Sequence, residues 1–312
     1  MRILVYGCGV IGSLTAHELI RAGNDVTVLA RGRWKEVLDK EGLVISHRPS
    51  MRTTRDRPRI IDTLEAGDRY DLIVVAMQWT QLPAVIPSIA KNTSPAVLLI
   101  GNNPDPSTTI EGLRAHDDGK TVLFGFQMSA GHRDEHRVVS FHMGVPITIG
   151  AAQGEASAPE RSLVERAFVG SRCRLTWEKN MAEWLAAHLA LVLPTVYLCR
   201  STGFNLKRAS WGDAGRILDA VKEARALLRD LGMSVNDKED AGFEAGAGRA
   251  LAQAMVWLMA KTPAGRLAAS DHCRNAPDEM DALDQAFEDM RAGSALTMPT
   301  WDALRRASRI TP

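Results

Sequence analysis

Short apolar runs rich in β-branched residues alternate with longer mixed segments through the first half of the chain. The first two runs lie at 2–6 and 25–30, and the segment between them mixes apolar and polar residues as a partly buried helix does. Later runs lie at 71–77, 96–101, 121–126, 137–142 and 146–151, with a helix-like segment near 80–91. The alternation predicts a doubly wound parallel sheet, and the last runs, joined by short connections, predict an antiparallel meander.

From about residue 173 the pattern changes to Ala-, Leu- and Arg-rich segments with helical spacing, for example at 213–232 and 277–293. Strands are no longer indicated there. The change predicts an N-terminal α/β domain at 1–170 followed by an all-α C-terminal domain at 171–312.

Two apolar segments raise the question of membrane insertion or export. The segment 181–199 has about the length of a membrane span, but it contains Glu183, His188 and Pro194, so we interpret it as a buried helix within a domain. The N-terminal run is interrupted by glycines and lacks the pattern of a signal peptide. We therefore expect a cytoplasmic protein that does not enter a membrane.

A glycine-rich turn joins the first strand to the helix that follows it. Its residues are Gly7, Cys8, Gly9, Val10, Ile11 and Gly12, which form G-x-G-x-x-G in a β-α-β context. In such a unit the first glycine makes a tight turn, the second admits a pyrophosphate, and the third lets helix and strand pack closely. The pattern predicts a Rossmann-like dinucleotide-binding domain. The alternative is a glycine-rich turn without a ligand.

The end of the second strand indicates which dinucleotide is bound. An acidic residue there would bind a ribose 2′-hydroxyl, whereas arginine accommodates a 2′-phosphate. The chain has Arg31 and Arg33 at this place and no acid. We therefore predict NADP(H), with Arg31 as the main phosphate ligand because a guanidinium presents paired donors. A solvated loop charge is the alternative.

Composition excludes other functions. The 38 Lys and Arg against 37 Asp and Glu in 312 residues leave a net charge of +1, and no basic run indicates nucleic-acid binding. The four cysteines contain no C-x-x-C pair, so neither a zinc site nor a disulfide framework is indicated. His132 and His136 lie close together, but we interpret the residues between them as a hairpin turn rather than a metal site.

Charged residues of the second half have ordinary explanations when taken alone. A helix is predicted to begin near 177–184, and Glu183 follows Lys179 four residues later on the same face of it. A lysine near a domain boundary is most often a surface charge. Asp278, Glu279 and Asp281 follow Pro277 at a helix start, where acids favour the helix dipole without any catalytic role.

The order of these pieces resembles the ketopantoate reductase family, over nearly the whole chain. The residues that carry the resemblance are GCGVIG at 7–12, Arg31, GNN at 101–103, SAGHRDEHRVVSFHMGVPITIG at 129–150, WEK at 177–179 and DEMD at 278–281. The resemblance implies an NADP-dependent oxidoreductase that reduces a 2-oxo acid, ketopantoate to pantoate in pantothenate biosynthesis, and it is compatible with a homodimer.

The resemblance also implies roles for single residues. Lys179 would be the general acid that protonates the ketone oxygen, and Glu279 would hold the hydroxyl of the substrate. Asn102 would contact both cofactor and substrate. A positioned ammonium suits this chemistry because hydride addition develops negative charge on oxygen.

The chain departs from the family near the substrate. Glu183 and Ala187 stand where the family has asparagines after the lysine, Gln78 stands where it has a lysine, and its serine pair before the glutamate is not recognisable. Three hypotheses therefore remain: a ketopantoate reductase, a reductase of a different carbonyl compound, and a non-catalytic NADP-binding sensor.

Overall fold

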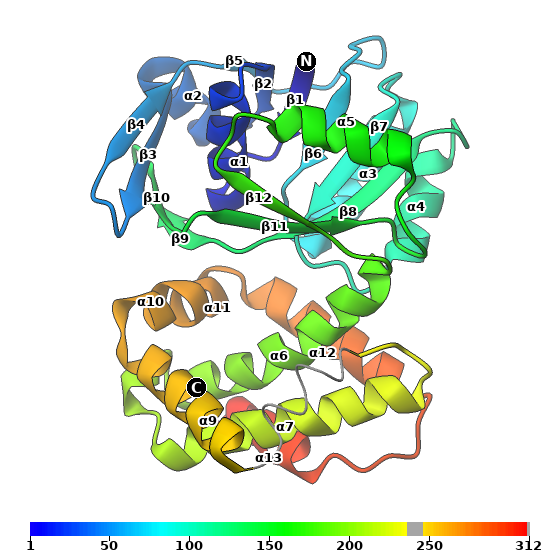
Figure 1. Ribbon diagram of the computed structural model, residues 1–312. Helices are drawn as coiled ribbons and strands as arrows, with labels where there is room; N and C mark the ends of the chain where they lie inside the picture. Colours follow the sequence, from blue (N-terminus) through cyan, green and yellow to red (C-terminus); the bar gives the residue numbers. More distant parts are fainter. Residues whose placement is uncertain (236–245, 311–312) are drawn as a thin grey trace. The chain divides into compact units, whose positions relative to one another are not determined.

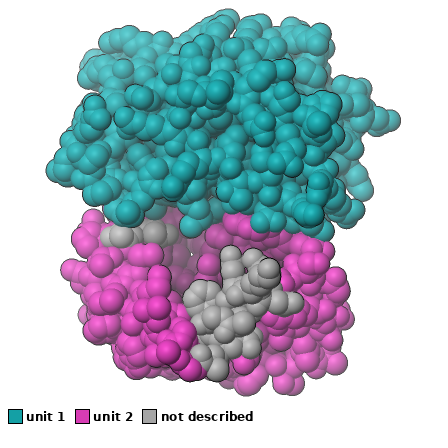
Figure 2. Space-filling view, viewed as in Figure 1, with its two compact units in different colours: residues 1–182 teal, residues 183–312 magenta. Residues whose placement is uncertain are grey.

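The computed structural model describes residues 1–235 and 246–310. The chain divides into two compact units, Met1–Ala182 and Glu183–Pro312 (Figure 2), and each is considered by itself. The boundary lies later than the expected one near 170. Strand β12 (Cys173–Trp177) is the reason, because it pairs in parallel with β11 (Val145–Gly150) and so ties residues 171–182 to the first unit.

The first unit is built on a sheet of eight strands in the order β12-β11-β8-β7-β6-β1-β2-β5 (Figure 1). The remaining members are β1 (Arg2–Tyr6), β2 (Asp25–Leu29), β5 (Arg59–Ile61), β6 (Leu72–Val75), β7 (Ala96–Ile100) and β8 (Thr121–Gln127). From β5 to β8 all neighbours are parallel, and β11 runs antiparallel to β8. The predicted doubly wound α/β domain is confirmed.

Helices connect and cover these strands. They are α1 (Val10–Arg21), α2 (Gly32–Glu41), α3 (Leu82–Lys91), α4 (Pro106–Arg114) and α5 (Ala158–Phe168), with a 3-10 turn η1 (Trp79–Gln81) before α3. Helices α1 and α5 share one core cluster with β1, and α3 packs against α4. The central strands are buried on both faces, because their side chains alternate between two layers of helices.

A second sheet lies within the same unit, in the order β4-β3-β10-β9. Its strands are β3 (Leu43–Arg48), β4 (Thr53–Asp56), β9 (Ala130–Arg133) and β10 (Val138–Phe141). The predicted meander is therefore wrong in one respect: β10 pairs with β3 and β9 rather than with β8 or β11. The predicted hairpin around Asp134 is confirmed, since β9 and β10 are antiparallel neighbours.

A directed chain of hydrogen bonds runs across this second sheet. The His142 Nδ1 atom lies 2.9 Å from the Gly144 carbonyl oxygen and must donate to it. In the neutral ring the Nε2 atom of His142 then accepts from His47 Nδ1 at 3.0 Å, and His47 Nε2 accepts from the Thr54 hydroxyl at 2.8 Å. The bonding pattern therefore fixes one tautomer for each neutral imidazole.

Acid should weaken this part of the fold. Burial lowers the pKa of His47 to about 4, and positive charge on His17, His142 and Arg172 lowers it further, against the opposing effect of Asp56. An unfolded histidine binds a proton near pH 6.5. Below pH 6.5 the unfolded chain therefore binds a proton at His47 that the folded protein does not bind. The free energy of unfolding is unaffected by His47 above pH 6.5, and it falls by up to about 3 kcal/mol as the pH falls from 6.5 towards 4.

The variant His47→Gln tests this expectation. Glutamine does not titrate, so the dependence of the unfolding free energy on pH between 6.5 and 4 should be shallower than in the parent protein. Chemical denaturation at a series of pH values measures it. An unchanged slope would show that His47 does not contribute.

The second unit consists of helices in its described residues (Figure 1). They are α6 (Met181–Ser201), whose first two residues lie in the first unit, α7 (Trp211–Asp230), α9 (Gly246–Lys261), α10 (Pro263–Gly265), α11 (Asp271–Asn275), α12 (Pro277–Arg291) and α13 (Pro299–Ile310), with short turns at Leu206–Arg208 and Arg266–Ser270. The predicted helices near 213–232 and 277–293 correspond to α7 and α12. The mostly helical character of this region is confirmed.

An aromatic and ionic cluster forms part of the core of the second unit. Trp301 packs against Phe287 with ring centroids 4.4 Å apart and against Tyr197 at 5.4 Å. Asp284 accepts hydrogen bonds from the Tyr197 hydroxyl and from Arg305. The Arg305 hydrogen bonds keep the pKa of Asp284 below its ordinary value although burial opposes this.

Helix α6 is the one described helix that is long and apolar enough to cross a membrane by length and composition. In the structure, 56% of its apolar window is buried, and Leu189, Leu193 and Tyr197 are among its buried side chains. A core helix satisfies the same criteria of length and composition. Its burial agrees with the interpretation as a core helix.

Candidate active site

Two of the three glycines after β1 are required by packing. Gly7 has a φ of +99°, and a Cβ atom there would lie 2.5 Å from the Ala76 carbonyl oxygen. A Cβ atom on Gly12 would lie 1.9 Å from the carbonyl oxygen of Gly7. The first glycine therefore makes the turn and the third lets α1 approach the strand.

The second glycine is different because nothing packs against it. A Cβ atom on Gly9 would have no neighbour within 4 Å. Gly9 is also the N-cap of α1 and makes no side-chain capping bond, so the first N–H groups of α1 remain available to an anion. The space at Gly9 and the helix start together fit the pyrophosphate of a dinucleotide.

The residues between the glycines have structural roles. Cys8 is buried and its Sγ atom lies 3.2 Å from the Ser13 hydroxyl, while Val10 and Ile11 begin α1 and are half-buried. Burial raises the pKa of the Cys8 thiol. Cys8 is therefore a neutral packing residue, and the loop offers the cofactor its backbone.

Arg31 is positioned at the end of β2. It is exposed and occupies the N-cap of α2. Its Nη2 atom donates to the Tyr6 hydroxyl at 2.9 Å, and its Nε atom donates to the Asp62 carbonyl oxygen at 3.2 Å. These bonds hold an exposed guanidinium beside a helix start that has no acid in its first turn. That combination suits a phosphate group.

Asn102 follows β7 at the same edge of the sheet as the glycine loop, because β1 and β7 are parallel. A cavity of about 10 Å³ lies there, lined by Val75, Met77, Leu82, Leu99, Ile100, Gly101, Asn102 and Asn103. The Oδ1 atom of Asn102 is buried and has no hydrogen-bond partner among the described residues. Its neighbour Asn103 instead bonds Thr109 and the Asp105 amide. Asn102 is thus the asparagine that remains available to a ligand.

On the side of the glycine loop away from β2 and Arg31, the carboxyl edge of the sheet is uncharged. The first three positions after each of β1, β6, β7 and β8 contain no charged residue; the larger side chains among them are Cys8, Met77, Gln78, Asn102, Asn103 and Met128. The polar residues among them, Gln78, Asn102 and Asn103, are uncharged. A carboxylate would find no cation among them.

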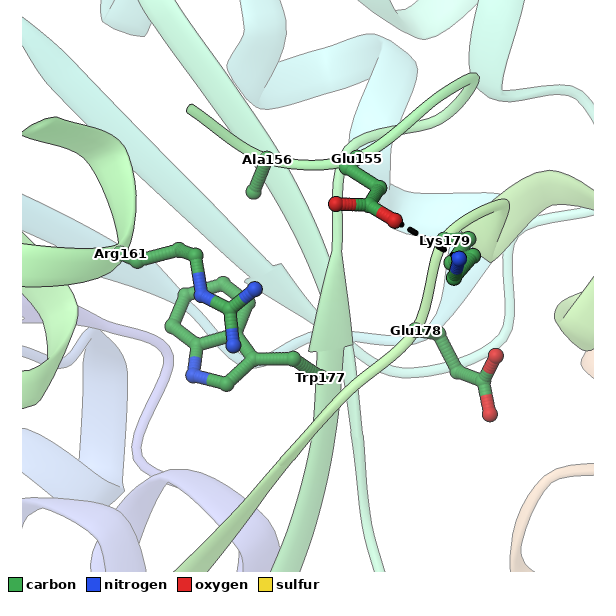
Figure 3. A pocket seen from close by; sticks show the side chains of 6 residues that line it. All are labelled: Glu155, Ala156, Arg161, Trp177, Glu178 and Lys179. Carbon is green, nitrogen blue, oxygen red and sulfur yellow. Dashed lines mark ion pairs between the residues drawn. The ribbon is translucent and has the colours of Figure 1, made fainter. Parts of the chain in front are cut away.

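Lys179 lies in the connection between β12 and α6, two residues before α6 begins at Met181. The expectation that Lys179 and Glu183 share a helical face is therefore wrong. The partner of Lys179 is Glu155, whose Oε1 atom lies 2.8 Å from the lysine Nζ atom (Figure 3). No sequence signal indicated Glu155, because it comes from a loop 24 residues earlier.

A surface pocket of about 90 Å³ surrounds this ion pair, lined by Glu155, Ala156, Arg161, Trp177, Glu178 and Lys179 (Figure 3). The Arg161 guanidinium lies 5.0 Å from the centroid of the Trp177 ring. The Lys179 side chain is 83% exposed, so its ammonium is accessible. The hydrogen bond and the charge of Glu155 raise the pKa of Lys179 and keep it protonated.

The registers show where the Lys179 segment lies in the sheet. Trp177 aligns with Ile149, Ile149 with Gly125, and Gly125 with Ile100, the last residue of β7. Trp177 therefore lies level with the end of β7, three strands along the sheet. Because β12 runs antiparallel to β8 and β7, the segment that carries Lys179 leaves this level in the direction opposite to that of β7.

Glu279 belongs to the second unit, in the first turn of α12. It is 3% exposed, whereas its neighbours Asp278 and Asp281 are exposed. An acid that only favours the helix dipole needs no such burial. Asp281 instead pairs with Arg200, at 2.6 Å. Glu279 is thus distinguished from the other acids of this helix start.

These features define a Rossmann-type dinucleotide-binding unit joined to a helical unit. Residues 3–154 match the model of the family ketopantoate reductase PanE/ApbA, which confirms the resemblance predicted from the sequence. The 2-dehydropantoate 2-reductase of Pyrococcus horikoshii is 35% identical over 75 residues, which cover 24% of each chain. The matches to curated relatives span about a quarter of the length of those relatives.

Solved structures extend the likeness in fold to the whole chain. The 2-dehydropantoate 2-reductase of Geobacter metallireducens is 18% identical, with a TM-score of 0.76 over 99% of both chains. D-mandelate dehydrogenase, in a ternary structure with NADH and anilino(oxo)acetate, is 15% identical, with a TM-score of 0.75 over 100% of this chain and 98% of its own. The fold is thus shared by relatives named for different substrates.

Proposed function

We propose that the protein is an NADPH-dependent oxidoreductase that reduces a small 2-oxo acid to the 2-hydroxy acid, with ketopantoate as the first substrate to test. The observation that carries the proposal is the loop at 7–12, where packing requires two glycines and the third borders open space at a helix start. The named relatives in this fold are oxidoreductases. We also propose the cytoplasm as its location.

The proposed roles follow from the chemistry of each side chain. NADPH supplies the hydride when it is bound. The backbone at Gly9 and the start of α1 would hold its pyrophosphate, and Arg31 its 2′-phosphate. Lys179 would protonate the carbonyl oxygen as negative charge develops there. Asn102 would bind cofactor and substrate, and Glu279 the substrate hydroxyl.

Cofactor preference provides a separate test. Arg31→Ala should weaken NADPH binding roughly tenfold or more and leave NADH binding unchanged, because only NADPH carries the phosphate that pairs with a guanidinium. Arg33→Ala is the matched control and should have little effect. Titration calorimetry of both cofactors measures it. Equal losses for NADPH and NADH in Arg31→Ala would contradict the role.

A different carbonyl substrate is the second candidate, and the lack of charge at the ends of β1, β6, β7 and β8 favours it. None of the first three residues after β1, β6, β7 and β8 would neutralise a substrate carboxylate. A panel of ketopantoate, other 2-oxo acids and uncharged ketones, assayed by NADPH oxidation, separates the candidates. Tight NADPH binding without oxidation by any compound would favour the non-catalytic sensor instead.

A further inference from the structure

A buried chain of hydrogen bonds joins α1 to the residues that follow β8. Thr15 on α1 donates to the Gln127 Oε1 atom at 2.7 Å, and the Gln127 Nε2 atom donates to the Ser129 hydroxyl oxygen at 2.9 Å. Thr15 is fully buried and Gln127 is 2% exposed. Thr15 also bonds the carbonyl oxygen of Ile11 in the glycine loop, at 2.9 Å. The chain of bonds therefore runs from the glycine loop to Ser129.

The segment 127–133 is held at both ends by helices of the nucleotide-binding unit. Its first end is bound to α1 through Gln127, and β9 at its other end also contacts α1. The Arg133 guanidinium lies 5.0 Å from the centroid of the Trp34 ring on α2. Trp34 in turn packs against the core cluster that includes Cys8 of the glycine loop. Ser129 thus lies in a segment that is fixed beside this loop.

The Ser129 hydroxyl has a hydrogen bond to spare. Its oxygen accepts from Gln127, and no described residue accepts its proton. The backbone N–H of Ser129 donates to the Gln127 carbonyl oxygen at 3.0 Å, so a tight turn fixes the residue, which is only partly exposed. A hydroxyl that is held by a buried amide and keeps one bond free suits a ligand.

The order of the strands indicates which part of a dinucleotide would reach Ser129. Arg31 follows β2 on one side of β1, whereas β6, β7 and β8 lie on the other side. With the pyrophosphate at the start of α1 and the 2′-phosphate at Arg31, the nicotinamide half extends towards the ends of β6, β7 and β8. Its carboxamide presents an acceptor and donors side by side, so it can bond a hydroxyl whichever way the proton points.

We propose that the Ser129 hydroxyl binds the carboxamide of the nicotinamide ring, and that Gln127 is the positioning residue that holds Ser129 in place. The inference rests on the proposed function, because it requires a bound dinucleotide. A bond to the carboxamide restricts rotation of the ring about its bond to ribose. It thereby orients the face of the ring from which the hydride leaves.

Titration calorimetry with two ligands tests the role of Ser129. The ligands are NADPH and 2′-phospho-ADP-ribose, which corresponds to NADPH without its nicotinamide. Ser129→Ala should weaken NADPH binding about fivefold to tenfold, the net effect of one neutral hydrogen bond, and leave 2′-phospho-ADP-ribose binding unchanged. Ser88→Ala is the matched control, because the Ser88 hydroxyl bonds only the Val85 carbonyl oxygen of its own helix. It should bind both ligands like the parent protein.

The variant Gln127→Met tests the positioning role. It should weaken NADPH binding in the parent protein and have no further effect in Ser129→Ala, because Gln127 acts through that hydroxyl. A merely structural glutamine would weaken the binding of both ligands, and its effect would add to that of Ser129→Ala. That result, unchanged NADPH binding in Ser129→Ala, or equal losses for the two ligands would each overturn the proposal. A parent protein that binds neither ligand would overturn the proposed function as well.

Discussion

Replacing Lys179 with alanine should lower kcat roughly 10²–10⁴-fold and leave the affinity for NADPH unchanged. The reason is that the ammonium would supply a proton and offset the charge that develops on the carbonyl oxygen. The side chain is 83% exposed in a connection outside the helices and strands, so its loss should not disturb the fold. Steady-state NADPH oxidation with ketopantoate measures kcat, and fluorescence titration measures binding.

The variant Glu155→Gln tests whether Lys179 acts as the general acid. Glu155 raises the pKa of Lys179, so its replacement should lower that pKa. A general acid works only while protonated, and activity falls as the pH rises through its pKa. The alkaline limb of the kcat profile should therefore move to lower pH in Glu155→Gln. Unchanged turnover in Lys179→Ala would remove the lysine from the mechanism.

If a compound other than ketopantoate is the substrate, the same variants remain informative. The substrate panel is assayed first with the parent protein, and Lys179→Ala is then compared on the compound that reacts fastest. A large loss on that compound supports the lysine while it rejects ketopantoate. Lack of turnover with every compound, with NADPH still bound, favours the sensor.

The central strands could be predicted because their signal is local. Strands β1, β6 and β7 are buried on both faces and therefore read as continuous apolar runs between polar connections. The helices α7 and α12 were equally visible from their spacing. Burial on one or both sides of an element gives its sequence a pattern of apolar residues, and this pattern can be recognised without knowing which distant residues the element contacts.

Strands β4 and β12 escaped prediction because they have no such pattern, whereas β3 was missed although its Leu43 and Ile45 are fully buried. Strand β4 reads TTRD and β12 reads CRLTW, and neither strand has a fully buried residue. Both lie at the edge of their sheets, where one side of the strand faces no partner. Their positions depend on pairing with other strands. The pairing of β12 with β11 is also the reason that the first unit ends at residue 182 rather than near 170.

The candidate site divides in the same way. The glycine loop and Arg31 lie within 30 residues and follow a known spacing, so the sequence predicted them together. The pairing of Lys179 with Glu155 arises from a loop held beside β12 and has no local signal. The burial of Glu279 likewise depends on packing within the second unit, and no local pattern separates it from the exposed acids Asp278 and Asp281 of the same helix start.

Gly9→Ala should weaken NADPH binding on the order of 100-fold while the protein folds normally. A methyl group at Gly9 would have no protein atom within 4 Å, so it costs the fold within about 1 kcal/mol as a poorer N-cap. It would occupy the space that the pyrophosphate requires. Titration calorimetry with NADPH measures the loss, and thermal unfolding without cofactor verifies the fold.

Gly12→Ala is the matched variant with the opposite outcome. A methyl group at Gly12 would lie 1.9 Å from the Gly7 carbonyl oxygen, so helix α1 must shift, and we expect a loss of at least about 2 kcal/mol of stability without cofactor. Gly67→Ala, at an exposed site where a Cβ atom would meet no neighbour within 4 Å, should change neither quantity. Gly9 and Gly67 both have room for a methyl group in the protein alone, so only a ligand that approaches the backbone at Gly9 would make the two substitutions differ. If Gly9→Ala bound NADPH as tightly as the parent protein, the loop would not be the pyrophosphate site.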